Sequence, residues 1–355
     1  MATEPSGSTP DQVELTDPAA GGAGDADARP RGHWWHIGGI FGFIVRRTLL
    51  GLLVLFLVSL IVFAATQALG DPARAILGRS ATPDSLAALR KQLNLDQPVL
   101  QQYWNWITGL LHGDAGTSLS AQIPVTDYLK DRVVNSAFLV LLAGGISIPI
   151  SIAIGSYAAL RRDRTFDVTS SLTTLVFAAL PEFVVGISLV VIFSTTVFTG
   201  FLPAITIIPP GGRPWDDMQA MILPTATLVL AVTPYVVRIM RASMIEVLES
   251  DYVEMARLKG LPERTVIVRH ALPNALGPTF QVIAINLAYL AGGVIVVEYV
   301  FNYAGIGGAL RDAVSTQDLP VVQALSMLIA AVYVVLNLMA DIATIIVTPR
   351  LRTRL

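Results

Sequence analysis

The sequence predicts an all-α polytopic membrane protein with six transmembrane helices and with both termini in the cytoplasm. Three observations carry this prediction: the composition, the length of the uncharged runs, and the distribution of Lys and Arg. Of the 355 residues 53% are hydrophobic and only 14% are charged, whereas soluble domains carry about 25% charged residues. The chain has no cysteine, which excludes disulfides, thiolate metal sites and a cysteine nucleophile.

Residues 1–35 are expected to form a disordered cytoplasmic tail, because they are rich in Pro, Gly, Ser and acidic residues and have few large apolar groups to bury. Residues 36–70 are expected to be an interfacial segment followed by the first transmembrane helix. Trp34 and Trp35 suit the membrane interface just before it. His33 and His36 lack further metal ligands in the sequence, so an interfacial role is favoured over a metal site.

Six runs are long enough to cross a hydrocarbon core of about 30 Å: residues 48–70, 133–160, 168–213, 218–237, 271–297 and 319–340. The third run is interrupted by Glu182. Of the 24 Lys and Arg residues, 16 fall on the side of the N-terminus and the even-numbered loops. Basic residues concentrate in cytoplasmic loops, so both termini are predicted to be cytoplasmic, and residues 133–355 are the expected core of spans two to six.

The long outer connection, residues 71–132, is predicted to be an extracytoplasmic helical region. Thr82, Pro83 and Asp84 are typical of a helix start, for a helix to about Leu93. A second helix starts near Asp96 and Pro98 and ends before Gly113, with an apolar stripe at Leu100, Tyr103, Trp104, Ile107, Leu110 and Leu111. The region is either a lid on the outer helix ends or a dock for an external partner, and the periodicity of its apolar residues is compatible with both.

No residue pattern in the chain indicates an active site. The four histidines lie outside the predicted spans, which excludes a serine–histidine pair within the membrane. A nucleotide-binding P-loop needs Gly-Lys followed by Ser or Thr, but none of the three lysines, Lys91, Lys130 and Lys259, follows a glycine. The chain is therefore not expected to be an enzyme or to bind a cofactor, and any ATP-driven motor must be another chain.

Three acidic residues lie in or near the predicted spans. Glu182 is expected about 14 residues, or about 21 Å, into its helix, where it could hold a substrate ammonium group or a proton, or could face water near the outer mouth. Asp341 lies near Arg350 and Arg352, which favours an ion pair or a helix contact over a proton relay. Glu298, at the outer end of span five, is expected to be solvated or to brace a loop.

Residues 238–273 carry eleven charged residues between two apolar spans. The pattern predicts a helix, a cap at Gly260, and a new helix whose first turn contains Pro262 and Glu263. Met244, Leu248, Tyr252 and Met255 are expected on one face of the first helix. An amphipathic helix–turn–helix of this kind favours docking of a cytoplasmic protein over a merely solvated loop.

This segment resembles the EAA loop of ABC-importer permeases. The residues that carry the resemblance are Glu254-Met255-Ala256, Gly260 six residues after the glutamate, and Leu272-Pro273. In that family the loop forms a coupling helix that sits in a groove of the ATPase subunit. The resemblance implies ATPase coupling by Glu254, Met255, Ala256, Arg257 and Gly260. Met255 stands where the family usually has a second alanine.

The resemblance extends over residues 42–355. Leu69-Gly70-Asp71-Pro72 and residues 95–118 are similar to the outer scoop of peptide/nickel-type permeases, specifically the first of their two paired permease subunits. Further matches follow in order: Gly292-Gly293 to Glu298, Phe301, Gly305-Ile306-Gly307, Gln317-Asp318-Leu319-Pro320, Asn337 and Pro349-Arg350. Thr348 departs from the acid common in the family. The resemblance implies that Trp106, Gly113, Asp114 and Gly116 dock a binding protein. Glu182 and Phe183 are predicted to line the substrate pathway from their position in the third apolar run.

The resemblance implies a multi-pass permease of the cell inner (cytoplasmic) membrane that carries di- and oligopeptides by alternating access. The implied partners are a second homologous permease, two ATPase subunits that hold ATP and Mg, an extracytoplasmic binding protein and membrane lipid, without nucleic acid. Nickel, opines, sugars or haem are alternative cargoes. A proton-coupled carrier that uses Glu182 and Asp341 is an alternative mechanism, and an ABC exporter is disfavoured because the loops outside 238–273 are short.

Overall fold

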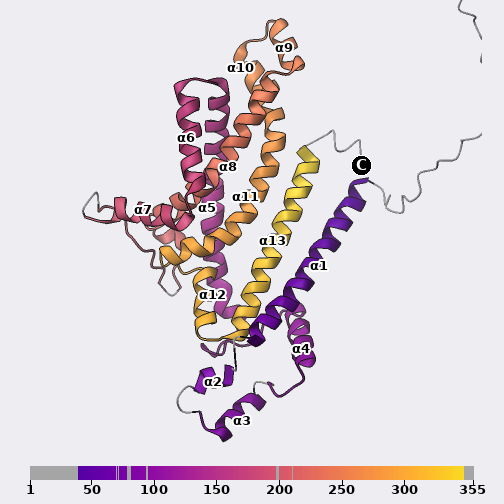
Figure 1. The fold of residues 1–355 in the computed structure, drawn as a ribbon, viewed down its shortest axis with the longest axis vertical. Coiled ribbons are helices and arrows are strands. Elements are labelled where there is room, and N and C mark those ends of the chain that lie inside the picture. Colours follow the sequence, from indigo (N-terminus) through magenta and orange to yellow (C-terminus); the bar gives the residue numbers. More distant parts are fainter. Residues whose placement is uncertain are drawn as a thin grey trace, which may run out of the picture. The chain divides into compact units, whose positions relative to one another are not determined.

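The computed structural model describes residues 39–68, 70, 72–77, 81–92, 95–196, 200–209 and 211–347. Its elements in chain order are α1 (Gly39–Ala68), α2 (Pro72–Leu77), α3 (Pro83–Gln92), α4 (Val99–Leu111), α5 (Val125–Leu160), α6 (Thr165–Ala179), α7 (Glu182–Ser194), a 3₁₀ turn (Pro214–Asp216), α8 (Ile222–Leu248), α9 (Asp251–Leu258), α10 (Glu263–Thr265), a π-helical segment (Val266–Ala271), α11 (Leu272–Val300), α12 (Ile306–Ser315) and α13 (Leu319–Val347) (Figure 1). Within these ranges the only β pairing is an isolated bridge between Thr117 and Pro124.

Several sequence predictions concern residues outside the described ranges. These are the tail 1–35, the interfacial residues 33–36, Leu69 and Asp71 of the scoop motif, Thr348, and the C-terminal arginines from Arg350 onward. The predicted all-helical class is confirmed by the described part of the chain.

Four helices in the described ranges are long and apolar enough to cross a membrane: α1, α5, α8 and α13. The pair α6 and α7 makes a fifth candidate, but the two helices are bent by 108° at their junction. The expectation of one continuous helix through Glu182 is therefore wrong. Leu180 is extended (φ −87°, ψ 132°), as expected for a residue before a proline, and Glu182 is the first residue of α7.

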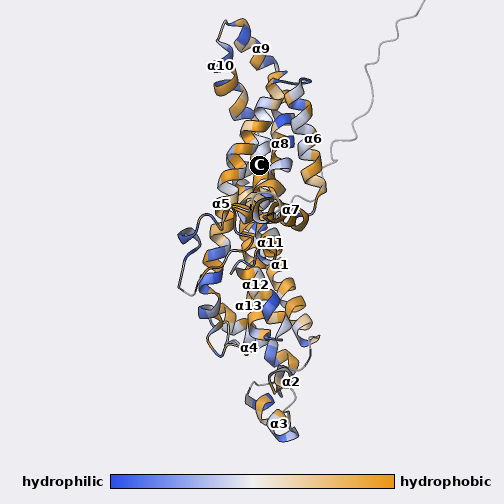
Figure 2. Ribbon diagram, turned by 90° about the vertical axis from the view of Figure 1, so that its left-hand side faces the viewer, coloured by the Kyte–Doolittle hydropathy of each residue, from blue (hydrophilic) through white to orange (hydrophobic). Residues whose placement is uncertain are grey.

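The helices pack around a core shared by α5, α8 and α11. Helix α13 packs between α11 and α1 and contacts both. Leu139, Leu228, Leu290 and Phe301 are among its buried side chains. Gly155 lets α5 approach α8 closely, since a Cβ there would lie 2.8 Å from the Val237 carbonyl oxygen. In contrast, α1 exposes many large apolar side chains, and the spans are mostly hydrophobic in Figure 2. This is the pattern of helices that face lipid on one side and protein on the other.

The connecting elements gather at two ends of the described helical unit, residues 39–347. Figure 1 shows α9 and α10 beyond the α5–α6 connection at one end, and α2, α3 and α4 at the other. The helix α7 runs across the bundle between these ends. The predicted coupling loop and the predicted scoop are therefore far apart in space.

Candidate coupling, pathway and docking sites

The predicted coupling loop forms a helical hairpin, but it begins differently from the prediction. The expected single apolar face from Met244 to Met255 is wrong, because α8 ends at Leu248 and α9 starts after an extended Ser250 (φ −81°, ψ 147°). Serine favours a helix N-cap, since its hydroxyl competes for backbone groups, and here it donates to the Val247 carbonyl at 2.5 Å. Met244 is completely buried in the bundle, whereas Met255 lies on the new helix.

The hairpin has a buried side and an exposed side. Val253 and Ala256 of α9 pack against Val266, so Ala256 holds the hairpin together. On the exposed side Tyr252, Met255 and Leu258 have 44%, 58% and 75% of their surface accessible, and Glu254 is exposed beside them. We call Tyr252, Met255 and Leu258 the α9 patch. An eight-residue helix that exposes three large apolar side chains beside charged ones has the composition of a docking element.

The turn after α9 needs a glycine for its backbone conformation. Gly260 has φ +76° and its N–H donates to the Arg257 carbonyl at 2.9 Å. A Cβ at this position would meet no atom within 4 Å, so the left-handed conformation alone favours glycine. The predicted glycine cap is confirmed.

Arg257 closes the hairpin across this turn. Its Nη2 donates to Glu263 Oε1 at 2.9 Å, and this hydrogen bond lowers the pKa of the Glu263 carboxyl below its ordinary value. Both side chains are substantially exposed, so the pair adds at most about 1 kcal/mol to stability. Arg257 thus forms its hydrogen bond to Glu263 within the hairpin itself.

A second set of contacts braces the helix that leads into the hairpin. Asp167, at the start of α6 and 2% exposed, accepts two hydrogen bonds from Arg241 of α8, at 2.5 and 2.7 Å. Nearby, Arg162 donates to Glu249 at 2.5 Å. These contacts tie the α5–α6 connection to the end of α8. Sequence reasoning missed them, because the partners are far apart in the chain.

Glu182 lies at the α6–α7 junction and has one hydrogen-bond partner in another helix. The Tyr289 hydroxyl of α11 donates to Glu182 Oε1. Tyr289 is 50% exposed and the adjacent Phe183 is 47% exposed. No feature of the sequence pointed to Tyr289, because an isolated tyrosine in an apolar span is common.

The other two acids have structural partners. Glu298 is 1% exposed, so the solvated alternative is wrong and the bracing one is confirmed. It accepts hydrogen bonds from the Ser136 hydroxyl and the Gly307 N–H. Gly307 also needs to be small, because a Cβ there would lie 2.6 Å from Ile295 Cα. Asp341 forms the predicted kind of ion pair, with Arg47 of α1 at 3.1 Å.

The two helices predicted in the outer region are present. Helix α3 is capped by Thr82, whose Oγ1 accepts the Ser85 N–H at 3.3 Å. The predicted stripe of α4 does not act as one buried face: Tyr103 is buried, but Leu100, Trp104 and Leu111 are 79%, 64% and 79% exposed. The helix instead packs through an aromatic cluster, Phe63 of α1 with Tyr103 and Trp106 at centroid distances of 5.3 and 5.9 Å.

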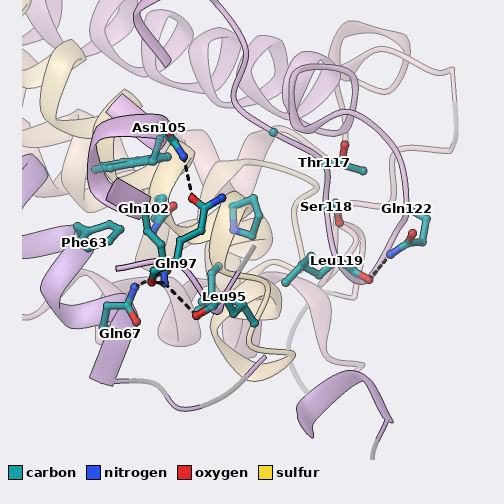
Figure 3. Close-up of a pocket in the computed structure, with 15 residues that line it drawn as sticks. Phe63, Gln67, Leu95, Gln97, Gln102, Asn105, Thr117, Ser118, Leu119 and Gln122 are labelled. Atoms are coloured by element: carbon teal, nitrogen blue, oxygen red, sulfur yellow. Dashed lines mark hydrogen bonds between the residues drawn. The ribbon is translucent and has the colours of Figure 1, made fainter. Parts of the chain in front are cut away.

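A cavity of about 610 Å³ lies between α4, the C-terminal end of α1, the loop 116–122 and the start of α13 (Figure 3). It is rich in amide side chains, and none of its lining residues in the described part of the chain is charged. These residues are Phe63, Gln67, Leu95, Gln97, Gln102, Asn105, Trp106, Gly116, Thr117, Ser118, Leu119, Gln122, Leu319, Pro320 and Gln323. Gln102 donates to the carbonyls of Leu95 and Gln97 at 3.1 and 2.8 Å. The cavity thus combines amide groups with apolar walls.

Two of the four predicted docking residues, Trp106 and Gly116, line this cavity. The other two build the turn beside it. Gly113 has φ +84°, and Asp114 Oδ1 accepts the Gly116 N–H at 2.8 Å. All four therefore gather at one corner of the region 71–132.

Comparison with known proteins decides the family. Residues 151–353 match the binding-protein-dependent transport system inner membrane component family, and residues 40–139 match the N-terminal part of membrane components of the same systems. This chain belongs to that family.

The permease has curated relatives over most of its length. It is 35% identical over 315 residues to the glutathione transport system permease protein GsiC of Escherichia coli strain K12, an alignment that covers 88% of this chain and 99% of the relative. The identity to GsiC of Salmonella choleraesuis strain SC-B67 is 36% over the same coverage. Each relative is therefore matched almost from end to end.

Membership of this family establishes in outline what the permease does. It is a multi-pass inner-membrane component of a binding-protein-dependent ABC importer, and it works with a binding protein, an ATPase and a paired permease. It is not itself an enzyme, and the family holds no cofactor on this subunit.

Asp318, which belongs to the Gln317–Pro320 motif, anchors the loop beneath the cavity. Its carboxylate accepts hydrogen bonds from the Ser118 hydroxyl (2.5 Å), the Leu119 N–H (3.1 Å), and the N–H and hydroxyl of Ser120 (3.0 and 2.8 Å). Burial opposes ionisation, but these bonds outweigh it and hold the pKa of Asp318 below its ordinary value. The motif thus fixes one wall of the cavity to α13.

Proposed function

We propose that this permease is the first of two paired subunits of a type I importer that carries di- and oligopeptides inward by alternating access. The observation that carries the proposal is the α9–α10 hairpin. It presents the exposed α9 patch at one end of the described helical unit (Figure 1). The chain itself contains no nucleotide-binding motif. Such a surface suits an ATPase that is a separate chain.

The proposed topology has six spans with both termini in the cytoplasm. Helix α11 has 29 residues, or about 43 Å at 1.5 Å per residue, which is enough to span, and α6 with α7 supplies the broken third span. The basic clusters of the α5–α6 connection and of residues 238–269 lie toward one end of the described unit, which supports a cytoplasmic assignment for that end.

The proposed domain plan keeps the boundaries of the sequence prediction: a tail at 1–35, an interfacial segment and first span at 36–70, the extracytoplasmic scoop at 71–132, and the core at 133–355. The proposed complex contains a second homologous permease, two ATPase subunits with ATP and Mg, a binding protein and surrounding lipid. ATP binding draws the two coupling hairpins together and opens the pathway outward, and hydrolysis resets it.

Within this plan the coupling residues have different roles. Glu254 and Met255 face the ATPase, Ala256 packs inside the hairpin, and Arg257 and Gly260 keep its shape. At the outer end, Trp106, Gly113, Asp114 and Gly116 form the proposed docking corner for the binding protein. An amide-rich cavity whose described lining residues are all uncharged suits the uncharged backbone of a polypeptide segment.

Small peptides are the proposed cargo. Relatives at 35% and 36% identity are named as glutathione transport permeases, which favours peptide-like molecules over nickel, opines or haem. The pairing of Asp341 with Arg47 argues against Asp341 as a proton carrier, and thus against a proton-coupled mechanism. Glu182 and Phe183 are proposed to line the pathway.

The test is ATP-driven peptide uptake in proteoliposomes that contain the permease pair, the ATPase subunits and the binding protein. Glu254→Lys and Gly260→Asp should abolish uptake and substrate-stimulated ATP hydrolysis while the protein still inserts. Asp84→Lys, an exposed charge reversal on α3, is the matched control and should retain both. Full activity of the two hairpin variants would refute the coupling assignment, and uptake that persists without ATPase activity would refute the importer mechanism.

A further inference from the structure

The Glu182–Tyr289 pair is an exposed polar pair on the described part of the permease, at the break between two membrane helices. Its two members come from α7 and α11 and are linked by the hydrogen bond described above. Glu182 is half-buried and Tyr289 is 50% exposed. Tyr235 of α8, 43% exposed, lies in the neighbourhood of Tyr289. Three helices therefore present polar groups to one surface.

This surface lies near the middle of the spans. Tyr289 is 17 residues from the start of α11 and 11 from its end, or about 26 and 17 Å along the helix. Tyr235 is 13 residues from each end of α8, or about 20 Å either way. Glu182 follows a 15-residue helix, or about 22 Å. The three positions agree on a depth close to the bilayer midplane.

A carboxylate at this depth does not face lipid. An ionised side chain at the centre of a bilayer costs about 3 kcal/mol or more. Glu182 is only half-buried within the chain, so hydrocarbon against its accessible part would leave much of that cost unrelieved. Within the described ranges no Lys, Arg or His nitrogen lies within 4.0 Å of Glu182. The surface must therefore face water or another subunit, and its negative charge lacks a cation.

The chemistry of the surface selects one kind of ligand. A carboxylate gives a strong, charge-assisted hydrogen bond to an ammonium group, and the faces of tyrosine and phenylalanine attract cations. Phe183 and Tyr235 supply such rings at the edge. A broken helix near the midplane is also where transporters build substrate sites.

We propose that Glu182 and Tyr289 form a cation subsite in the translocation pathway that receives the ammonium group of the substrate, with Tyr235 and Phe183 at its edge. The subsite rests on the proposed peptide-import function, which it refines by naming the substrate end that is recognised. It favours peptides with a free amino terminus over peptides whose amino group is blocked.

The first test compares uptake of a tripeptide with that of its N-acetylated form in the reconstituted complex. Glu182→Gln should lower the uptake ratio of free to acetylated peptide about ten-fold, and Tyr289→Phe should lower it a few-fold. The matched control is Tyr333→Phe on α13, where the tyrosine is 52% exposed, and it should leave the ratio unchanged. An unchanged ratio in Glu182→Gln, or an equal loss for both peptides, would overturn the subsite. Loss of complex assembly would instead indicate an ion pair with the paired permease, and would also overturn it.

The second test does not depend on the cargo. Because the chain has no cysteine, Phe183→Cys introduces a unique thiol beside Glu182. In the assembled complex we compare the rates of trimethylammonium-ethyl methanethiosulfonate and its sulfonate-ethyl analogue, each divided by the rate of the same reagent with a free thiol in solution. The normalised rate of the cationic reagent should be about ten-fold higher, and adding Glu182→Gln should remove this preference. Equal normalised rates, or no reaction with either reagent, would refute the subsite. If no peptide is taken up but the charge preference is present, the proposed peptide cargo fails while the cation subsite stands.

Discussion

Removing the side chain of Met255 tests the α9 patch with little disturbance of the fold. Met255 is 58% exposed on α9, and alanine is a better helix former, so the hairpin should persist. Full burial of a methionine side chain is worth about 1.5–3 kcal/mol. If ATPase docking buries the exposed part, and alanine recovers a fraction of it, Met255→Ala should cost about 1 kcal/mol, or about a five-fold weaker Kd.

The assay is the Kd between the purified permease pair and its ATPase subunit, measured in nanodiscs by a fluorescence or interferometric titration. Leu111→Ala is the control: Leu111 is 79% exposed but lies on α4 at the opposite end of the unit, so the Kd should not change. Met255→Asp should weaken the Kd beyond the alanine value, because docking would then bury a carboxylate. A Kd within two-fold of the unaltered protein for both Met255 variants would refute burial of this patch.

Three further outcomes follow from the geometry. Gly260→Ala should destabilise the turn by about 1–2 kcal/mol, because alanine disfavours a backbone φ of +76°. The variant should uncouple ATP hydrolysis from uptake without lowering expression. Unimpaired coupling would contradict this. Asp318→Asn should lower the melting temperature in circular dichroism at pH 7, since it weakens hydrogen bonds worth about 1.5–3 kcal/mol each. Because the folded pKa of Asp318 is depressed, its contribution is complete above the unfolded pKa near 4 and is lost as the pH falls through the folded value; a melting difference that stays constant down to pH 3 would argue against the ionised anchor. Gly307→Ala should destabilise the protein strongly, because its Cβ would lie 2.6 Å from Ile295 Cα, whereas Gly145→Ala, with no atom within 4 Å, should be tolerated.

Local sequence signals predicted the local structure well. Thr82 and Pro83 start α3, Gly113 follows α4, and Gly260 ends α9 with a positive φ. Each of these features depends on a few adjacent residues, because a cap or a glycine turn is satisfied by its own neighbours. The same is true of the charged hairpin, whose pattern indicated a docking element.

Two breaks in helices were harder to predict. A long apolar run contains no signal for where a helix ends, so the bend at Leu180 was not predicted although Pro181 follows it. The break at Ser250 was not predicted because the helical spacing of apolar residues continues past it. Helices in membranes often tolerate proline without breaking. Whether they break depends on packing elsewhere, which periodicity does not contain.

The contacts that assemble the candidate sites join distant parts of the chain. Tyr289 and Glu182 are 107 residues apart, and Asp167 and Arg241 are 74 apart. The sequence identified Glu182 as unusual but supplied no partner for it. The burial of Glu298 was likewise decided by the fold, since a carboxylate at a helix end can be solvated or bonded.

The proposed mechanism requires that a separate ATPase drives the permease through α9. The most direct measurement is photo-crosslinking from a unique thiol at Met255→Cys in the otherwise cysteine-free chain, within the assembled transporter. We expect an efficient crosslink to the ATPase subunit whose yield changes when ATP is bound, and no such product from Trp104→Cys on α4. A transporter that takes up substrate normally while Met255→Cys yields no ATPase crosslink in any nucleotide state would contradict it.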